Sequence, residues 1–529
     1  MHEEITSGYY EKSPFQLIIY YYYRNQLELV TLDDGTMQQV LYKLQGAVKR
    51  ATGILKEKVS GSLPENTIAP GTIYNGILGS SWSSTLPIGV ALMFLRLEQQ
   101  ASYVEDDDEI LHLASEFHEL ACSRLSYSVP EDIPLRPGRL SPLGSASLGA
   151  SVLRVFAGLA RPTRQKVPSH DIIMLQRTTE FAIKQGTTVG GDEALYGRAG
   201  VLLALLQIRQ QCKDDGNTAA FTATFTMIPR LAAVIIETGK VGASDYNDLY
   251  GGQDALSLMW PWHAGILSIL LACKPDELND GTINHLPIIA ETISGLCKLT
   301  IENAGNLPSS VPIRSSSRHD PYVQICHGSP GLLILLAQAE NNTHLMHSFW
   351  EPDWDKAIRL GSEQVWERGL LFKGGGLCHG IAGNAWPFLL LYNSFEYGKE
   401  RIALARRSFK ERTGSVASVE EQLTPDYFLS RALTLLLYAR KTPPFHRREF
   451  RDECEFRMPD TPFSLFEGLA GTCAAWGEAC VVIKDRLRRK ELDDGGSCSL
   501  SEIGGRDGLL SKHLQHELGF PGLTLGGLC

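Results

Sequence analysis

Hydrophobic residues along the chain fall into two alternating patterns. In the first, a Gly-x-x-Gly turn leads into a nearly continuous apolar run with helical spacing. Clear copies of this run are Val201–Ile208, Leu332–Ala337, Asn384–Tyr392 and Thr472–Ile483, which follow the turns at 197–200, 328–331, 380–383 and 468–471. Looser copies begin at Gly76, near Gly144–Gly149 and at His263. The first pattern therefore indicates seven repeated units.

The second pattern is that of an amphipathic helix, and it occurs between the apolar runs. Its copies are Asp107–Arg124, Ile172–Gln185, Pro287–Ala304, Trp354–Arg368 and Tyr427–Arg440. Alternation with a period of two, which is typical of strands, is scarce, so the sequence predicts an all-α protein built from about seven helical hairpins. Such a chain forms either a closed (α/α) toroid, similar in architecture to the six-hairpin glycosidases, or an open α-solenoid. We expect the glycines to let each helix approach its neighbours where a Cβ would clash.

Five stretches rich in proline, serine or charged residues are predicted to be exposed loops. They are Ser126–Pro142, Asn306–Pro321, Ser408–Thr424, Lys441–Pro462 and Leu487–Gly508. None of them is long enough to be a convincing linker between domains. We therefore expect a single domain over residues 1–529, with recognisable repeats over about 74–485 and poor matches to the repeat over 1–40 and 487–529.

Two of the glycine turns carry a cysteine and a histidine side by side. Cys326 and His327 precede one turn, and Cys378 and His379 precede another. A lone Cys-His pair is more often a buried thiol beside a hydrogen-bonded histidine than a metal site. Two pairs at the heads of similar segments favour a metal site, because zinc prefers thiolate and imidazole donors and needs three or four of them.

Composition narrows the class of protein further. The 529 residues are 43% hydrophobic and 21% charged, which is typical of a globular protein with a large core. The net charge of −10 argues against a nucleic-acid partner, and the eleven thinly spread cysteines do not form a secreted disulfide framework. Acidic residues precede the short apolar stretch Leu17–Tyr23, and a membrane span needs about 20 apolar residues. We expect a cytoplasmic protein without a transmembrane segment, although the tyrosines at 20–23 leave peripheral membrane contact open.

The motifs, in this order, resemble those of the LanC-like proteins, the eukaryotic relatives of bacterial lanthionine synthetase cyclases. The matching stretches are Tyr196–Gly200, Cys326–Gly331, Gly376–Ala385 and Phe463–Gly471. The resemblance implies a double ring of seven inner and seven outer helices. It also implies a zinc ion held by Cys326, Cys378 and His379, with His327 outside the ligand set. In that family the zinc activates a thiol, and the eukaryotic branch resembles enzymes that add glutathione to dehydroalanine or dehydrobutyrine.

Two further residues are candidates for catalysis. Lys373 lies five residues before Cys378 and could stabilise an enolate or bind a carboxylate of the thiol substrate; the alternative is a solvated loop lysine. His263 is the candidate acid of the fourth repeat, where the family's cyclases have a His-Gly-x-x-Gly turn. Here Gly265 follows His263 after one residue, and Trp262 matches a Trp-His pair that the family has further upstream. We therefore expect the usual acid to be missing from this repeat.

Three functions remain open at this point. The first is a zinc-dependent thiol transferase that adds glutathione or another thiol to dehydroamino acids in peptides or proteins. The second is a zinc- and glutathione-binding protein that turns over slowly and has a binding or regulatory role, because the fourth repeat is disrupted. The third is a sugar-active toroid enzyme, which needs two carboxylates about 5–10 Å apart. None of the glycine turns offers such a pair, so we rank this function last.

Overall fold

The computed structural model describes most of the chain, with gaps. The described residues are 21–59, 88–105, 110–125, 135–160, 167–187, 191–212, 215–250, 262–279, 281–308, 322–415, 420, 422–446, 456–493 and 516–524.

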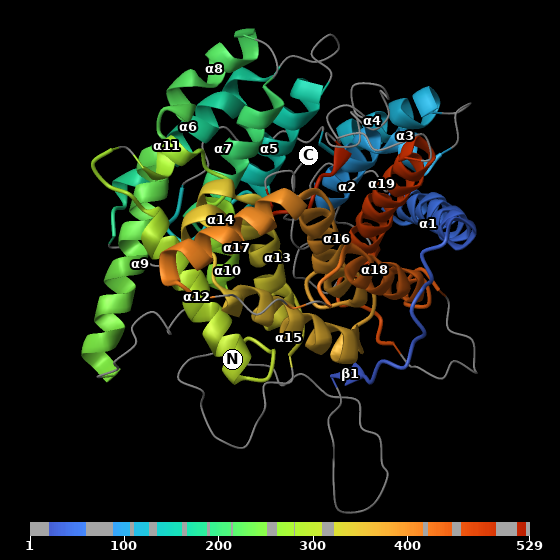
Figure 1. The fold of residues 1–529 in the computed structure, drawn as a ribbon. Helices are drawn as coiled ribbons and strands as arrows, with labels where there is room; N and C mark the ends of the chain where they lie inside the picture. Colours follow the sequence, from blue (N-terminus) through green and yellow to red (C-terminus); the bar gives the residue numbers. More distant parts are fainter. Residues whose placement is uncertain are drawn as a thin grey trace, which may run out of the picture.

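Seven apolar helices form an inner ring (Figure 1). Each of them contacts the next one along the chain, and the last, α19, also contacts the first, α2, so the ring is closed. The inner helices are α2 (Ile88–Gln99), α5 (Ala146–Ala160), α7 (Arg198–Gln211), α10 (Trp262–Leu270), α13 (Ser329–Asn341), α16 (Ile381–Tyr397) and α19 (Leu469–Asp493). The predicted all-α toroid is confirmed, and closure of the ring excludes the open solenoid.

Seven further helices surround the ring, and each contacts at least one inner helix. They are α1 (Asp34–Val59), α4 (Ile110–Leu125), α6 (Ser169–Lys184), α9 (Ile228–Tyr250), α12 (Leu286–Glu302), α15 (Pro352–Arg368) and α18 (Pro425–Ala439). The outer helix α1 packs on the last inner helix, α19, so the two ends of the repeat array meet. Sequence analysis did not identify α1, although Met37, Val40, Leu44 and Val48 are buried at helical spacing. Its partner lies more than 400 residues away in the chain, beyond the reach of any local repeat pattern.

The remaining elements lie outside these two sets of seven helices. They are α3 (Ala101–Val104), α8 (Asp215–Phe225), α11 (Pro275–Leu278), α14 (Thr343–Phe349), α17 (Lys399–Thr413), β1 (Tyr22–Tyr23) and β2 (Leu370–Leu371). Two predicted loops were wrong in part, because α17 occupies the start of Ser408–Thr424 and α19 runs into Leu487–Gly508. The charged residues that suggested loops lie on helices whose other residues pack inward, as Ile402 and Ala405 of α17 do.

The N-terminal tyrosines that are described pack on the toroid. Tyr22 and Tyr23 pair with Leu371 and Leu370 in an antiparallel two-stranded sheet. The ring of Tyr23 lies 5.4 Å from that of Phe456 in an edge-to-face arrangement. Tyr20 lies outside the described residues. Tyr22 and Tyr23 therefore contact the toroid.

One stretch passes a simple test for a membrane span. Residues Thr218–Ser244 are long and apolar enough, with a mean hydropathy of 1.7. They cover most of α8, the turn at 226–227 and most of α9, and 44% of their most apolar 18-residue stretch is buried in the fold. Core helices of soluble proteins pass the same test, so this stretch is weak support for a membrane segment.

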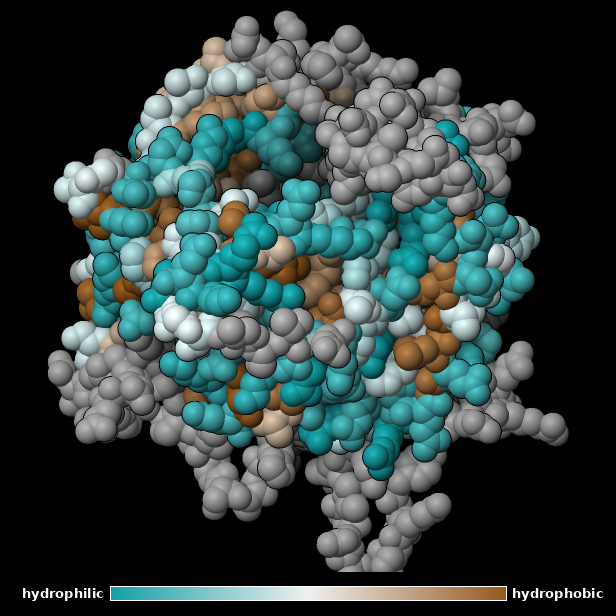
Figure 2. All heavy atoms as spheres, viewed as in Figure 1, coloured by the Kyte–Doolittle hydropathy of each residue, from teal (hydrophilic) through white to brown (hydrophobic). Residues whose placement is uncertain are grey.

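The hydrophobic core fills the ring and the space between the two layers. Every residue from Ser329 to Ala337 in α13 and from Ile381 to Tyr392 in α16 is buried. These helices are apolar on all sides because one side meets the outer layer and the other meets the ring interior. On the face shown in Figure 2, hydrophilic residues cover most of the described surface and hydrophobic ones form small separate groups.

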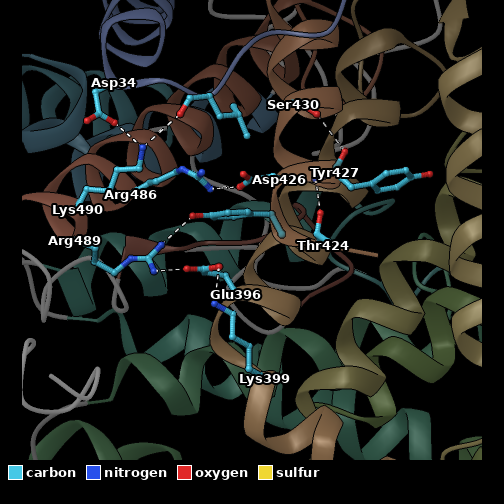
Figure 3. A network of polar contacts seen from close by, with 12 residues as sticks. Asp34, Glu396, Lys399, Thr424, Asp426, Tyr427, Ser430, Arg486, Arg489 and Lys490 are labelled. Carbon is cyan, nitrogen blue, oxygen red and sulfur yellow. Dashed lines mark hydrogen bonds and ion pairs between the residues drawn. The ribbon is translucent and has the colours of Figure 1, made fainter. Parts of the chain in front are cut away.

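Ion pairs fasten α19 to its neighbours around the ring closure (Figure 3). Arg489 pairs with Glu396 of α16 at 2.7 Å, and Arg486 pairs with Asp426 of α18 at 2.6 Å. Lys490 pairs with Asp34 at the start of α1, also at 2.6 Å. The last inner helix is thereby linked to the inner helix before it and to two outer helices.

The glycine turns are compact because each one folds back on its own preceding loop. A Cβ on the second glycine of the turn would lie 1.8–2.8 Å from the carbonyl oxygen six residues earlier; these pairs are Gly200–Ala194, Gly331–Ile325, Gly383–Leu377 and Gly471–Leu465. Real Cβ atoms do not come this close to oxygen, so the repeated glycine is a steric requirement. The prediction that glycine permits close approach is confirmed, but the contact is chiefly with the turn's own loop.

Candidate functional site

The turns at the start of the inner helices converge at one end of the ring. A cavity of about 70 Å³ is lined there by residues from six of the seven repeats. The residues from these repeats are Leu143, Ala194, Leu195, Gly265, Ile325, Cys326, Gly331, Cys378 and Phe466. The turn of the first repeat, at 76–79, lies outside the described residues. Ring closure therefore brings together side chains that are more than 300 positions apart in the sequence.

Hydrogen bonds between neighbouring turns set the positions of the two Cys-His motifs. The amide of Cys378 donates to the carbonyl of Phe466 at 2.7 Å, and the amide of Ile325 donates to the carbonyl of Cys378 at 3.1 Å. Buried Asn384, in the first turn of α16, donates its side-chain amide to the carbonyl of Val323 at 2.8 Å. The loop before α13 is therefore held against the loop before α16, and the two cysteines become neighbours.

The three predicted ligands meet at this point. One donor atom from each of Cys326, Cys378 and His379 lies within 4.8 Å of the others. Cys378 is 4% exposed, while Cys326 and His379 are half-buried. Two sulfurs and one imidazole nitrogen at this spacing fit the donor set that zinc prefers. His327 is not part of this cluster, and its ring centre lies 5.9 Å from that of Tyr322.

The two thiols differ in their readiness to ionise. A hydrogen bond with the Cys378 side chain lowers the pKa of the Cys326 thiol against the opposing effect of burial, and the positive charge of Lys373 also lowers it. The same hydrogen bond, together with burial, raises the pKa of Cys378 well above its ordinary value. Cys326 is therefore the first of the pair to become a thiolate, which is the form that binds metal.

The structure describes the side chain of Lys373, whereas of His263 it describes only the position in the chain. Lys373 is half-buried in the loop after β2 and close enough for its charge to act on Cys326. His263 is the second residue of α10, two positions before Gly265, which lines the cavity. The side chain of His263 lies outside the described part of the structure.

Sequence analysis missed one component of the site, the C-terminal segment at 516–524. Phe520, Pro521, Gly522 and Leu523 line the same cavity as Cys326 and Cys378. Two charged residues within apolar stretches could have indicated it, since Arg96 and Glu478 are buried and both hydrogen-bond to Gly519. The described residues lining the cavity are apolar, glycine or proline except for the two thiols.

Comparison with known families agrees with this arrangement. A family model described as "Lanthionine synthetase C-like protein" matches residues 76–413, more than half of the chain. The chain belongs to this family. The match covers both Cys-His motifs and ends before the last inner helix, α19.

Two members of the family with curated names illustrate the likeness. The protein named "Glutathione S-transferase LANCL1" from Danio rerio is 29% identical over 299 residues, which are 55% of this chain and 60% of that protein. "LanC-like protein GCL1" from Arabidopsis thaliana is 26% identical over 410 residues, which are 74% of this chain and 82% of that protein. The chain thus spans less than two thirds of the length of the Danio rerio protein.

Proposed function

We propose that this LanC-like protein activates a thiol, with glutathione as the first candidate, for addition to dehydroalanine or dehydrobutyrine residues in peptides or proteins. The observation that carries the proposal is the cluster of Cys326, Cys378 and His379 donor atoms within 4.8 Å at an otherwise apolar cavity. The printed name of the Danio rerio relative, a glutathione S-transferase, supports the choice of thiol.

The donor set fits zinc, so we assign these three residues as its ligands. When bound, zinc supplies the Lewis acidity that lets a thiol in the open position lose its proton near neutral pH. In the reaction, the sulfur forms a bond to the β-carbon of the acceptor as the carbon–carbon π bond breaks. The electron pair moves toward the acceptor carbonyl, and a proton is then added at the α-carbon to give a thioether.

The chain's own residues have distinct roles in this proposal. Lys373 provides a positive charge beside the thiol pair, where it can bind a carboxylate of glutathione or stabilise the negative charge on the acceptor carbonyl oxygen. The apolar lining excludes water from the reacting atoms and strengthens that electrostatic interaction. His263, Lys373 or a water molecule supplies the α-proton, and this step depends most on a correctly placed acid.

A second candidate function is binding without efficient turnover. It is favoured by the fourth repeat, where Gly265 follows His263 after one residue and the His-Gly-x-x-Gly turn of the family's cyclases is not formed. The structure gives no support to a sugar-active enzyme, because that chemistry needs two carboxylates and none is found among the described residues that line the cavity.

Metal analysis and a thiol-addition assay test the proposal together. Purified wild-type protein should contain zinc and form a thioether from glutathione and a dehydroalanine peptide, as detected by mass spectrometry. Cys378→Ala should lose most of the zinc and the activity. His327→Ala, which changes the histidine next to Cys326 in the chain, should keep the zinc. Full zinc content in Cys378→Ala would show that the ligand assignment is wrong. Zinc without thioether formation in the wild type would favour the binding protein.

A further inference from the structure

The C-terminal segment 516–524 is anchored inside the ring by polar groups from three inner helices. Arg96 of α2 donates to the carbonyl of Gly519 at 2.6 Å, and the amide of Gly519 donates to Glu478 of α19 at 2.9 Å. Gln207 of α7 donates to the carbonyl of Thr524 at 2.9 Å. Each of these three residues is at most 1% exposed, and each lies among buried apolar residues of its helix. Burying such groups is costly unless they are hydrogen-bonded, so docking of the segment offsets part of that cost.

Between these anchors, the segment fits closely against the inner ends of the repeats. Phe520 is fully buried, with its ring centre 5.4 Å from that of Trp386 in α16 and 6.5 Å from that of Phe466. Gly522 has a φ of +79°, and a Cβ there would lie 2.8 Å from Leu143. The backbone at this point accepts glycine alone without strain, so its path is narrowly defined.

The segment also forms one side of the cavity that holds the two thiols. Leu523 is a lining residue, and its Cδ2 lies 3.1 Å from the position that a Cβ on Gly265 would take. The cavity is about 70 Å³, its lining is apolar apart from the thiols, and its other walls are formed mainly by the loops that lead into the inner helices. Leu523 is therefore the side chain of the segment that can set the free space without altering the ring.

We propose that the C-terminal segment, through Leu523, is the size-selecting wall of the reaction site. It admits the side chain of dehydroalanine and disfavours dehydrobutyrine, which carries one more methyl group. This inference rests on the proposed function. A hydrophobic pocket discriminates about 10- to 200-fold for one carbon, so we expect wild-type kcat/KM for dehydroalanine to exceed that for dehydrobutyrine at least about tenfold.

Three variants test this proposal through the ratio of kcat/KM for dehydroalanine to kcat/KM for dehydrobutyrine. Leu523→Ala removes three carbon atoms from the wall and should reduce the preference for dehydroalanine to about threefold or less. Leu523→Phe should narrow the space and lower kcat/KM for both acceptors. Leu333→Ala is the matched control, because Leu333 is a buried leucine of α13 that packs toward Gly361 of α15 and is absent from the cavity lining. It should keep the wild-type preference.

A second readout needs neither zinc nor turnover. In metal-free protein, Cys326 is alkylated with iodoacetamide or with a bulky N-aryl maleimide, and labelling is quantified at that residue by mass spectrometry. Leu523→Ala should raise the ratio of bulky to small labelling at Cys326 by about tenfold over the wild type. Leu523→Phe should lower the ratio, which keeps the test valid if Leu523→Ala loses its structure as judged by circular dichroism.

The two readouts separate failure of the wall from failure of the proposed function. If the labelling ratio is the same in wild type, Leu523→Ala and Leu523→Phe, the proposal that Leu523 limits the size of the acceptor is refuted, whatever the catalytic result. If the labelling ratio shifts as expected but no protein forms a thioether, the wall is supported and the proposed transferase activity is rejected. If Leu523→Ala keeps the wild-type preference for dehydroalanine over dehydrobutyrine, the proposal is also contradicted, because the enlarged space should accept the additional methyl group.

Discussion

Replacing Glu478 by glutamine tests how the buried charges of α19 and α2 respond to pH. The Glu478 carboxylate is fully buried and accepts hydrogen bonds from Gln100 at 2.6 Å and from the amide of Gly519 at 2.9 Å. Arg96 lies 3.9 Å away and directs its Nη2 donor to Gly519 instead. Burial raises the pKa of Glu478 from 4.5 to about 7, and the nearby charge of Glu517 also raises it. The positive charge of Arg96 and the two hydrogen bonds lower this pKa, but by less than burial raises it. The desolvation cost thus exceeds the attraction of an arginine that is not in direct hydrogen-bonding contact.

The sign and size of the effect on stability follow from this shift. Because the folded protein holds the Glu478 proton more tightly than the unfolded chain does, stability falls as pH rises from about 4.5 to about 7. A shift of about 2.5 pKa units corresponds to a loss of about 3 kcal/mol, of which about 2.5 kcal/mol falls between pH 5 and pH 8. With an unfolding entropy of about 2 cal/mol/K per residue, this loss lowers the Tm of a chain of this size by about 2 °C.

Glutamine resembles the protonated acid, so Glu478→Gln should lack this component of the pH dependence. We expect the Tm of the wild type minus that of the variant to fall by about 2 °C from pH 5 to pH 8, as measured by calorimetry. Glu491→Gln, at the exposed end of the same helix, is the control for removing one acid and should show no such trend. A Tm difference that is constant or rises with pH would mean that Arg96 stabilises the Glu478 anion and that burial does not dominate.

Two further predictions concern the glycine turns and the fourth repeat. In Gly383→Ala, the new Cβ would lie 1.8 Å from the carbonyl oxygen of Leu377, so we expect a loss of about 1–3 kcal/mol of stability and a lower zinc content. Gly239→Ala, with no atom within 4 Å of its Cβ position, should instead stabilise α9 by about 0.4–1 kcal/mol, and thermal melts with metal analysis distinguish the two. Restoring a His-Gly-x-x-Gly turn ahead of α10 should raise the rate of glutathione addition to a dehydroalanine peptide about 100-fold, since that is a typical contribution of a general acid. Equal rates with and without the restored turn would show that the proton donor lies elsewhere.

Much of the architecture could be predicted from local patterns. The continuous apolar runs after glycine turns predicted the inner helices, because a helix surrounded by other helices needs apolar residues on every side. The amphipathic segments predicted five of the outer helices, α4, α6, α12, α15 and α18, but not α9. The Cys-His pairs at Cys326 and Cys378 could be identified as one donor set because two equivalent turns of a toroid must face the same end of the ring.

Other features depend on the tertiary structure alone. The pairing of α1 with α19 joins the two ends of the chain, and no local pattern in Asp34–Val59 indicates which helix covers it. The C-terminal segment contains no repeat motif, and its position near Cys326 follows from hydrogen bonds to Arg96, Glu478 and Gln207 in three separate helices. The sequence by itself thus determined the helices, the glycine turns and the identity of the donor residues, since these depend on side-chain chemistry and short-range spacing. Ring closure decided which residues share the cavity, because contacts between distant parts of the chain arise only when all the helices pack together.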